Sequence, residues 1–302
     1  MVFVPATVSR FSAHSTEATV KDFVGLLKPG VMALVVFSGW VGIYLAPNNL
    51  HPFLQGVALL AIALGSGAAG ALNMWYDRDI DALMKRTQSR PIPAGLIAPQ
   101  DALIFGMVLA VFSIVLMGLS TNYFAAILLA FSIFFYAVIY TMVLKRTTVH
   151  NIVIGGAAGA FPPVIGWVAS TGTISLEAIL LFLIIFLWTP PHFWALALTK
   201  IEDYERANIP MLPNVAGPQA TKKQILIYSL MLVMASYFFF WFPHYSWVYG
   251  LIITFLNCLW LFFTFKLYFD ARHANAMRLF GFSIIYLFLL LGALVLDHGM
   301  NQ

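Results

Sequence analysis

The chain of 302 residues is 61% hydrophobic and only 9% charged, with a mean hydropathy of +0.89, which excludes an ordinary soluble globular protein. Its formal net charge of +4 reflects where the basic residues lie along the chain and gives no ground for a nucleic-acid partner. The single cysteine, Cys258, excludes an internal disulfide and a cysteine-based metal site.

Apolar runs of about 20 residues, the length that crosses a bilayer as a helix, recur along the whole chain. Nine are predicted to span the membrane, at 26–46, 52–71, 102–120, 123–143, 151–170, 176–196, 224–242, 247–268 and 279–296. Spanning strands would need shorter, alternating segments, so the predicted fold class is an all-α integral membrane protein with nine transmembrane helices. Residues 1–24 are expected to form a flexible cytoplasmic N-terminal tail.

The basic residues give an independent check on the number of spans. With nine spans, all 16 Lys and Arg side chains fall on one side of the membrane. By the positive-inside rule that side is cytoplasmic, so the N-terminus is predicted to be cytoplasmic and the C-terminus outside. The two long, charged loops at 72–101 and 197–223 lie on the same side, and long loops on one face usually carry function. We therefore expect the active site at the cytoplasmic face.

The first of these loops opens with a dense charge cluster, NMWYDRDIDALMKRTQSRP. Asn73, Asp77 and Asp81 are spaced four residues apart, so on a helix they share one face, whereas Asp79 points away from it. Carboxylate and amide oxygens without Cys or His suit a hard cation such as Mg²⁺, which is usually shared with a substrate phosphate. The spacing therefore predicts a metal site on this face.

Basic side chains accompany the acids. Arg86 and Arg90 carry guanidinium groups that fit phosphate or carboxylate oxygens, and the smaller inner loop YTMVLKRTTVHN adds Tyr140, Lys145 and Arg146. Taken alone, the first loop is equally well explained as a solvated interfacial segment whose acids and bases neutralise each other. The second long loop favours the functional interpretation.

That second loop reads TPPHFWALALTKIEDYERANIPMLP from 189 to 213. Pro190 and Pro191 lie inside a predicted span and are expected to break or kink the helix. Behind them come His192, Phe193 and Trp194, and then a charged cluster of Glu202, Asp203, Glu205 and Arg206. Two acidic sites with a basic rim at one membrane face indicate a pocket for a metal-bound diphosphate whose lipid tail lies among apolar helices.

These residues resemble the UbiA superfamily of intramembrane prenyltransferases, which have nine helices and Asp-rich motifs on the cytoplasmic loops after the second and sixth. The pattern NxxxDxxxD at 73–81 matches the first motif in place and spacing. Longer patterns resemble the heme-modifying branch: DxxMxRTxxRPxPxG at 81–95, TPPHFWxLxxxxxxDYxxAxxPMLP at 189–213, LKPGVM at 27–32 and LKRTTVHNIVIGGAAGAFPPVIGW at 144–167. The resemblance covers most of the chain and implies that residues 25–302 form one domain of this type.

The activity that this resemblance implies is transfer of the farnesyl group from farnesyl diphosphate to a vinyl group of heme b, with addition of water. The products would be heme O and diphosphate, and heme b would be a substrate, not a permanent cofactor. Mg²⁺ on the first motif would bridge the diphosphate oxygens. The expected leaving-group contacts are Lys145, Arg146 and Arg86, and the expected shields of the allylic cation are Tyr140, Phe193 and Trp194.

The second motif departs from the common superfamily pattern, because Asp203 is followed four residues later by Ala207 and not by a second aspartate. One carboxylate fewer is then available for a second metal. The resemblance still implies Asp203 as a metal ligand, and as a catalytic residue together with Asp77, Asp81, Lys145 and His192. Three roles stay open for His192: ligand of the heme iron, contact to a propionate, or base for the water. Arg90 and Arg206 are expected to contact substrate.

Two alternatives remain. A transporter or passive heme-binding membrane protein would be expected to bury ionisable residues near the bilayer midplane, whereas here the charges collect at one face. An aromatic prenyltransferase of quinone or chlorophyll biosynthesis would keep the first motif but has no reason to carry PPHFW followed by DY. The expected location is a bacterial inner membrane, with heme O passed to a heme A synthase or to terminal oxidase assembly.

Overall fold

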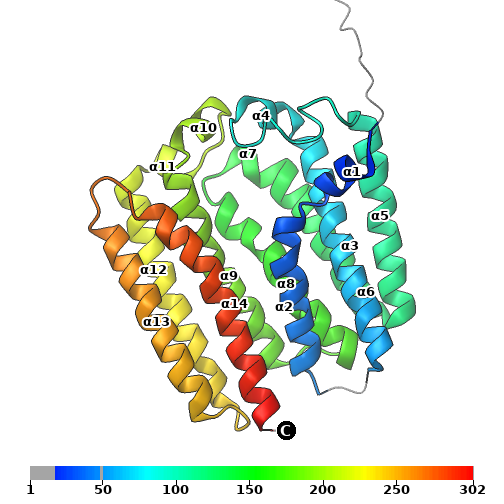
Figure 1. Cartoon of the computed structure of the whole chain (residues 1–302), viewed down its shortest axis with the longest axis vertical. Helices are drawn as coiled ribbons and strands as arrows, with labels where there is room; N and C mark the ends of the chain where they lie inside the picture. The colour runs from blue at the N-terminus through cyan, green and yellow to red at the C-terminus, as the bar shows by residue number, and fades with distance from the viewer. Residues whose placement is uncertain (1–17, 48–49, 302) are drawn as a thin grey trace, which may run out of the picture.

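The computed structural model describes residues 18–47 and 50–301, and within these ranges it contains helices and no strands (Figure 1). Eight helical segments are long and apolar enough to cross a membrane. They are Pro52–Tyr76 (α3), Pro99–Ser120 (α5), Tyr123–Thr147 (α6, η1 and α7), Asn151–Thr171 (α8), Leu176–Leu198 (α9), Pro218–Trp241 (α12 and η2), Trp247–Tyr268 (α13) and Ala276–Met300 (α14). The prediction of an all-helical membrane protein is confirmed.

The first predicted span, at 26–46, differs from the single helix expected there. It appears as two helices, α1 (Val20–Leu26) and α2 (Pro29–Leu45), bent by 57° at the break between them. Counted as one broken span, the pair brings the total in the described residues to nine. Lys28, at the break, has a φ of 56°, a left-handed conformation that a non-glycine residue adopts only when its surroundings hold it there.

The predicted flexible tail lies mostly outside the described residues, which begin at Ala18. Its last five residues, 20–24, are helical and belong to α1. The Asp22 carboxylate accepts hydrogen bonds from the Thr19 backbone N–H at 2.9 Å and from the Thr19 hydroxyl at 2.6 Å, which favours a helix start here. The predicted boundary at residue 24 thus falls inside α1.

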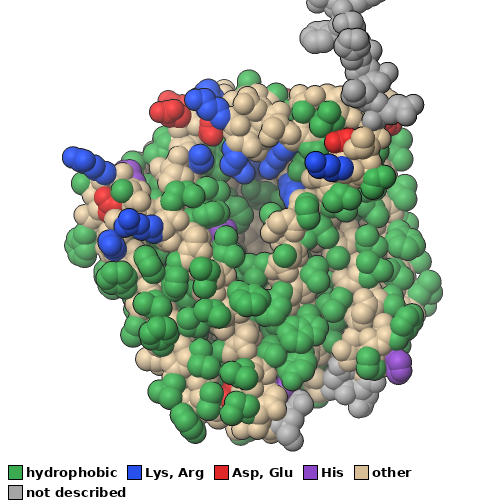
Figure 2. All heavy atoms as spheres, in the orientation of Figure 1, with side chains coloured by type: hydrophobic (Ala, Val, Ile, Leu, Met, Phe, Trp, Pro, Cys, Tyr) green, Lys and Arg blue, Asp and Glu red, His purple; other side chains and the backbone are tan. Residues whose placement is uncertain are grey.

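The short helices between the spans gather at one end of the bundle. These are α1, α4 (Arg78–Leu83), α7 (Lys145–Thr147), α10 (Ile201–Arg206) and α11 (Leu212–Val215), at the top of Figure 1, whereas α14 ends at the opposite end. On the face shown in Figure 2, the Lys and Arg side chains collect at the same end as these helices. Below them the surface is hollowed between α2 and α14 (Figures 1 and 2).

Glycine lets α2 and α8 approach backbone to backbone in the centre of the bundle. A Cβ atom at Gly42 would stand 1.9 Å from the carbonyl oxygen of Pro163, and one at Gly166 would stand 2.1 Å from that of Gly39. No side chain fits at such distances, so any larger residue would push the helices apart.

Helix α9 is continuous from Leu176 to Leu198, although it contains Pro190 and Pro191. Of the predicted break or kink, the break is therefore wrong. A proline removes one backbone donor, but in membrane helices neighbouring helices and hydroxyl side chains compensate for such a loss. Here α9 packs between α8, α12 and α14, and the Thr189 hydroxyl donates to the Ile185 carbonyl at 2.7 Å. His192 thus lies within a regular helix.

Candidate functional site

The first motif lies where α3 ends and α4 begins, and all three of its side chains point inward. Asn73, Asp77 and Asp81 are 3%, 0% and 1% exposed. Asp77 separates the two helices, yet Asp77 and Asp81 each donate a backbone N–H to the residue four positions earlier. The helical spacing is therefore kept across the junction. The Asp79 side chain is 60% exposed, so the expectation that it points away is confirmed.

Asn73 connects three segments of the chain at this point. Its amide nitrogen donates to Asp77 Oδ2 at 2.7 Å and to the Thr141 hydroxyl at 3.0 Å. Its amide oxygen accepts from the Lys28 ammonium at 2.6 Å. Because both ends of the amide are engaged, Asn73 fixes the Asp77 carboxylate relative to the break before α2 and to the helix η1.

Asp77 is buried among cations. Its Oδ2 accepts a short hydrogen bond from the Lys145 ammonium, and Nη2 of Arg146 lies 3.5 Å from Oδ1. Oδ1 is buried and accepts no hydrogen bond from any described residue. Asp81 is held in a similar way, with its Oδ2 2.6 Å from Arg90 Nη1. Each carboxylate is thus neutralised by a base while Asp77 keeps an oxygen with unused acceptor capacity.

The helix η1 (Phe135–Leu144), a ten-residue π-helix, delivers the bases Lys145 and Arg146 to this cluster. Long π-helical stretches are rare and often lie at functional sites. The Thr141 hydroxyl donates to the Tyr136 carbonyl at 2.8 Å and accepts from Asn73. Tyr140 packs so tightly on α8 that a Cβ atom at Gly155 would stand 2.2 Å from its ring.

The second loop meets the first through α10. Asp203 is 6% exposed and forms a short ion pair with Arg206. The next residue, Tyr204, lies near the Arg86 side chain, and burial raises the pKa of this hydroxyl above its usual value of 10 although Arg86 opposes the shift. A cavity of about 340 Å³ lined by Lys85, Lys200 and Asp203 lies between the loops. The structure therefore brings the two acidic loops together, as the sequence predicts.

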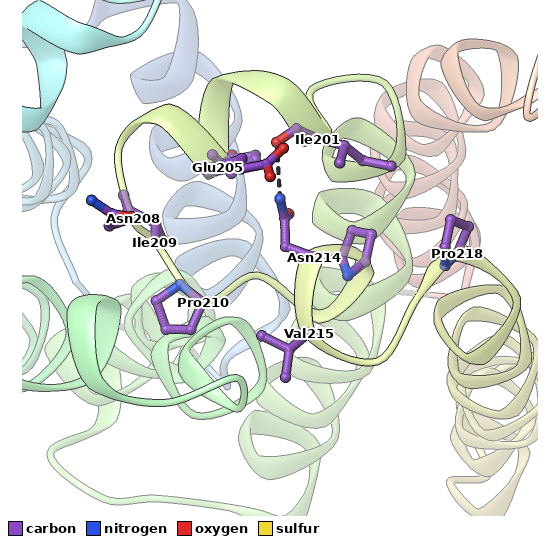
Figure 3. A pocket seen from close by; sticks show the side chains of 10 residues that line it. Ile201, Glu205, Asn208, Ile209, Pro210, Asn214, Val215 and Pro218 are labelled. Atoms are coloured by element: carbon purple, nitrogen blue, oxygen red, sulfur yellow. Dashed lines mark hydrogen bonds between the residues drawn. The ribbon is translucent and has the colours of Figure 1, made fainter.

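A second cavity, of about 480 Å³, lies beside this cluster and not on it (Figure 3). It is lined mainly by residues of α10, α11 and the turn between them, where the Asn214 side chain donates to the Ile201 carbonyl at 2.9 Å. Its lining contains three prolines and one acid, Glu205, but no Lys or Arg. This cavity lacks the cations that a phosphate group would need.

His192 lies apart from the acids, in an aromatic slot between α9 and α14. Its ring stacks on Trp188 at 4.3 Å and on Phe280 at 4.6 Å between centroids. Nδ1 lies 2.6 Å from the Ser283 hydroxyl oxygen. Phe193, which is 38% exposed, meets the His192 ring edge-on at 5.1 Å. The slot is thus built from residues of two helices about 90 positions apart in the sequence.

Trp194 lies on a different side of α9 from Phe193. Its side chain is 2% exposed and packs edge-on against Tyr228 of α12, at 5.5 Å between ring centroids. One residue on a helix turns the side chain by about 100°, so Trp194 and Phe193 face different neighbours. Trp194 stabilises the contact between α9 and α12, and of the two only Phe193 borders His192.

The donor set of the first motif fits a hard cation. No three His, Cys, Asp or Glu side chains of the described ranges lie close enough to hold a metal, so protein ligands alone do not complete a metal site. Mg²⁺ commonly takes one or two carboxylates and completes its shell with water and substrate phosphate. The open oxygen of Asp77 and the neighbouring Asp81 match that requirement.

Comparison with known proteins identifies the family. Residues 35–292 match the UbiA prenyltransferase family. The chain belongs to this family. It is 53% identical to a protoheme IX farnesyltransferase of Rhizobium johnstonii over 287 residues, covering 94% of this chain and 91% of that one. It is 51% identical to a protoheme IX farnesyltransferase of Agrobacterium fabrum over 291 residues, covering 95% and 92%. As a member of this family, the chain is a prenyltransferase.

Solved structures show the same fold at low sequence identity. A digeranylgeranylglyceryl phosphate synthase matches with a TM-score of 0.77 at 18% identity, covering 92% of this chain and 98% of that one. A UbiA homologue from Archaeoglobus fulgidus bound to DMAPP and Mg²⁺ matches with a TM-score of 0.65 at 15% identity, covering 90% and 99%. The helical arrangement is therefore that of UbiA membrane proteins.

The sequence analysis missed several residues of the site. Lys28, Thr141, Tyr204 and Ser283 each contact one of its predicted residues. Lys28 lies within the quoted LKPGVM pattern, where a base directly before a proline-initiated helix could have been noticed. Thr141 and Ser283 lie inside apolar spans and depend on contacts with distant helices, so no local pattern marks them.

Proposed function

We propose that this protein transfers the farnesyl group of farnesyl diphosphate to a vinyl group of heme b, with addition of water, giving heme O and diphosphate. The observation that carries the proposal is the buried acid pair ringed by bases, in a chain 53% identical to a protoheme IX farnesyltransferase. The hollow between α2 and α14 would give apolar substrates access from the side (Figure 2).

Asp77 and Asp81 would hold Mg²⁺, with Asn73 fixing Asp77 and with Asp203 approaching from the second loop. The metal, when bound, neutralises charge on the diphosphate. The acids of the site are paired with or lie near bases: Asp77, Asp79, Asp81 and Asp203 with Lys28, Arg86, Arg90, Lys145, Arg146 and Arg206. Bases that now pair with carboxylates would turn to phosphate oxygens when diphosphate binds, and each would keep an anionic partner.

The reaction breaks the bond between C1 of the farnesyl group and the diphosphate oxygen, and diphosphate leaves with the electron pair. Lys145 and Arg146 would stabilise the leaving oxygens, because both already point at the Asp77 carboxylate. Tyr140, Phe193 and Trp194 would shield the allylic cation. The vinyl group of heme b forms the new carbon–carbon bond, and water then adds a hydroxyl group to the resulting cation and releases one proton.

Arg86, Arg90 and Arg206 would bind substrate oxygens at the mouth of the site. Arg90 is 21% and Arg206 40% exposed in their side chains, so both reach solvent while holding an acid. Their guanidinium groups fit the heme propionates as well as they fit phosphate. His192 and the aromatic slot would form the heme side of the site.

We place the site at the cytoplasmic face of a bacterial inner membrane, with the N-terminus inside and the C-terminus outside. The collection of Lys and Arg at one end supports this orientation, as do nine crossings if α1 and α2 form one broken span. Reporter fusions in the 84–98 loop should report a cytoplasmic location, and a periplasmic one would reverse the orientation. Transfer of heme O to a heme A synthase or to oxidase assembly remains part of this proposal.

The direct test is incubation of the purified full chain with heme b, farnesyl diphosphate and Mg²⁺, followed by mass analysis of the porphyrin. The expected product is heme b plus one farnesyl group and one hydroxyl. A parallel reaction with an aromatic quinone precursor addresses the alternative activity within the family. Prenylation of the aromatic acceptor, with heme b returned unchanged, would overturn the proposal.

A further inference from the structure

The Ser283 hydroxyl oxygen makes two close contacts. It lies 2.5 Å from the Phe280 carbonyl oxygen and 2.6 Å from His192 Nδ1. Its single hydrogen can serve only one of them, and we assign it to the shorter contact, so that Nδ1 donates to the hydroxyl oxygen. With this assignment the neutral imidazole carries its proton on Nδ1, and Nε2 keeps a lone pair.

The same serine is also bonded by the residue one turn before His192. The Trp188 indole N–H donates to the Ser283 carbonyl oxygen at 2.8 Å, so two donors of α9 converge on one residue of α14. The stacks on Trp188 and Phe280 hold both faces of the imidazole ring. His192 is 8% exposed, and no described residue donates a hydrogen bond to Nε2. The ring is fixed with an unused lone pair.

We propose that Nε2 of His192 is an axial ligand of the heme iron. Ser283 is the positioning residue that fixes the orientation and the tautomer of the His192 ring. Metal-binding histidines commonly donate their other ring N–H to a protein oxygen, which sets both tautomer and orientation. The 2.6 Å contact between Ser283 and His192 Nδ1 is of this kind. The inference rests on the proposed function in one respect, namely that heme b is the acceptor substrate.

The surroundings of the ring favour ligation over a role as base for the water. A base would become an imidazolium ion, and none of the residues that contact His192 in the slot is acidic: Trp188, Phe193, Phe280 and Ser283. Burying such a charge without a partner is costly. Iron ligation uses the lone pair of a neutral imidazole and adds no charge to the ring.

The test is a spectroscopic titration of the purified full chain with ferric heme b and, separately, with iron-free protoporphyrin IX. Wild type should show the spectrum of an imidazole-bound heme and should bind heme b more tightly than protoporphyrin IX. Ser283→Ala should weaken heme b binding by about tenfold and leave protoporphyrin IX binding unchanged. Ser283→Thr, which keeps the hydroxyl, should restore the spectrum.

A matched control is Ser113→Ala. Ser113 is also fully buried, and its hydroxyl donates to the carbonyl three residues earlier, Ala110, at 2.9 Å. Loss of the Ser113 hydroxyl should change the affinity for neither heme b nor protoporphyrin IX. For His192→Gly, added imidazole should restore the heme spectrum if the ring supplies the ligand.

Identical heme spectra and affinities in wild type, Ser283→Ala and His192→Gly would overturn the inference. Equal weakening of heme b and protoporphyrin IX binding in Ser283→Ala would overturn it as well, because the effect would then not pass through iron. A failure of the proposed function is distinguishable from a failure of this inference. The product assay on wild type reports on farnesyl transfer, whereas the heme titration reports on the iron ligand.

Discussion

Two aspartates at opposite ends of the bundle are equally buried but differ in their bonding. Asp77 and Asp297 are both 0% exposed. Asp297, near the end of α14, accepts from the Ser246 backbone N–H at 2.7 Å, from the Ser246 hydroxyl and from the Tyr249 backbone N–H at 3.2 Å. Asp77 accepts from side chains only, and its Oδ1 accepts no hydrogen bond from the described residues.

The difference separates a structural carboxylate from one available for chemistry. Asp297 satisfies the first backbone donors of α13 and so ties that helix to α14. Asp77 pairs with the ammonium and guanidinium groups of two side chains and with no backbone donor, and its Oδ1 accepts no hydrogen bond from the described residues. Burial alone therefore does not mark a functional acid; an incomplete set of partners does.

The largest expected effect is on turnover in Asp77→Asn. The substitution removes the charge that would hold Mg²⁺, and the rate of farnesyl transfer should fall at least about 100-fold. The amide oxygen at the position of Oδ2 keeps the hydrogen bonds from Asn73 and Lys145, and the two cations that lose their charge partner still reach solvent. The melting temperature should therefore fall by less than in Asp297→Asn. Initial rates and thermal unfolding in detergent measure both. A large loss of stability would make Asp77 a structural residue like Asp297.

The same substitution at Asp297 should give the reverse pattern. An amide in Asp297→Asn places an N–H group against backbone donors of Ser246 or Tyr249, which costs about 1–3 kcal/mol of stability. The melting temperature should fall by several degrees, and turnover at low temperature should be kept. Thermal unfolding and the same rate assay measure both quantities for Asp297→Asn. If this variant folded stably but lost turnover, the distinction between Asp77 and Asp297 would be wrong.

The smallest effect is expected for Asp79→Asn. The Arg146 hydrogen bonds, at 2.7 Å, lower the pKa of the Asp79 carboxyl below its usual value of 3.8. The ion pair is therefore intact above that value and is lost only as pH falls through the lowered pKa. Because the pair is largely exposed, its removal should reduce turnover less than about fivefold, by the same factor from about pH 6 to 8. If Asp79→Asn lost as much turnover as Asp77→Asn, the distinction between the buried Asp77 and the exposed Asp79 would be contradicted.

Local patterns predicted the spans and the first motif well. Hydropathy over about 20 residues depends only on neighbours in sequence, and so does the spacing that buries Asp77 while leaving Asp79 exposed. The pairing of His192 with Ser283 joins residues 91 positions apart, and the continuity of α9 through Pro190 depends on its packing against other helices. Tertiary contacts decided these features, which is why the sequence did not predict them.

The most direct test of the central claim is the affinity for farnesyl diphosphate with and without Mg²⁺, measured by calorimetric titration of wild type, Asp77→Asn and Asp297→Asn. The open oxygen of Asp77 predicts that Mg²⁺ tightens binding in wild type and in Asp297→Asn, and that Asp77→Asn loses this dependence while binding heme b normally. Tight, Mg²⁺-dependent binding of farnesyl diphosphate to Asp77→Asn would contradict the account.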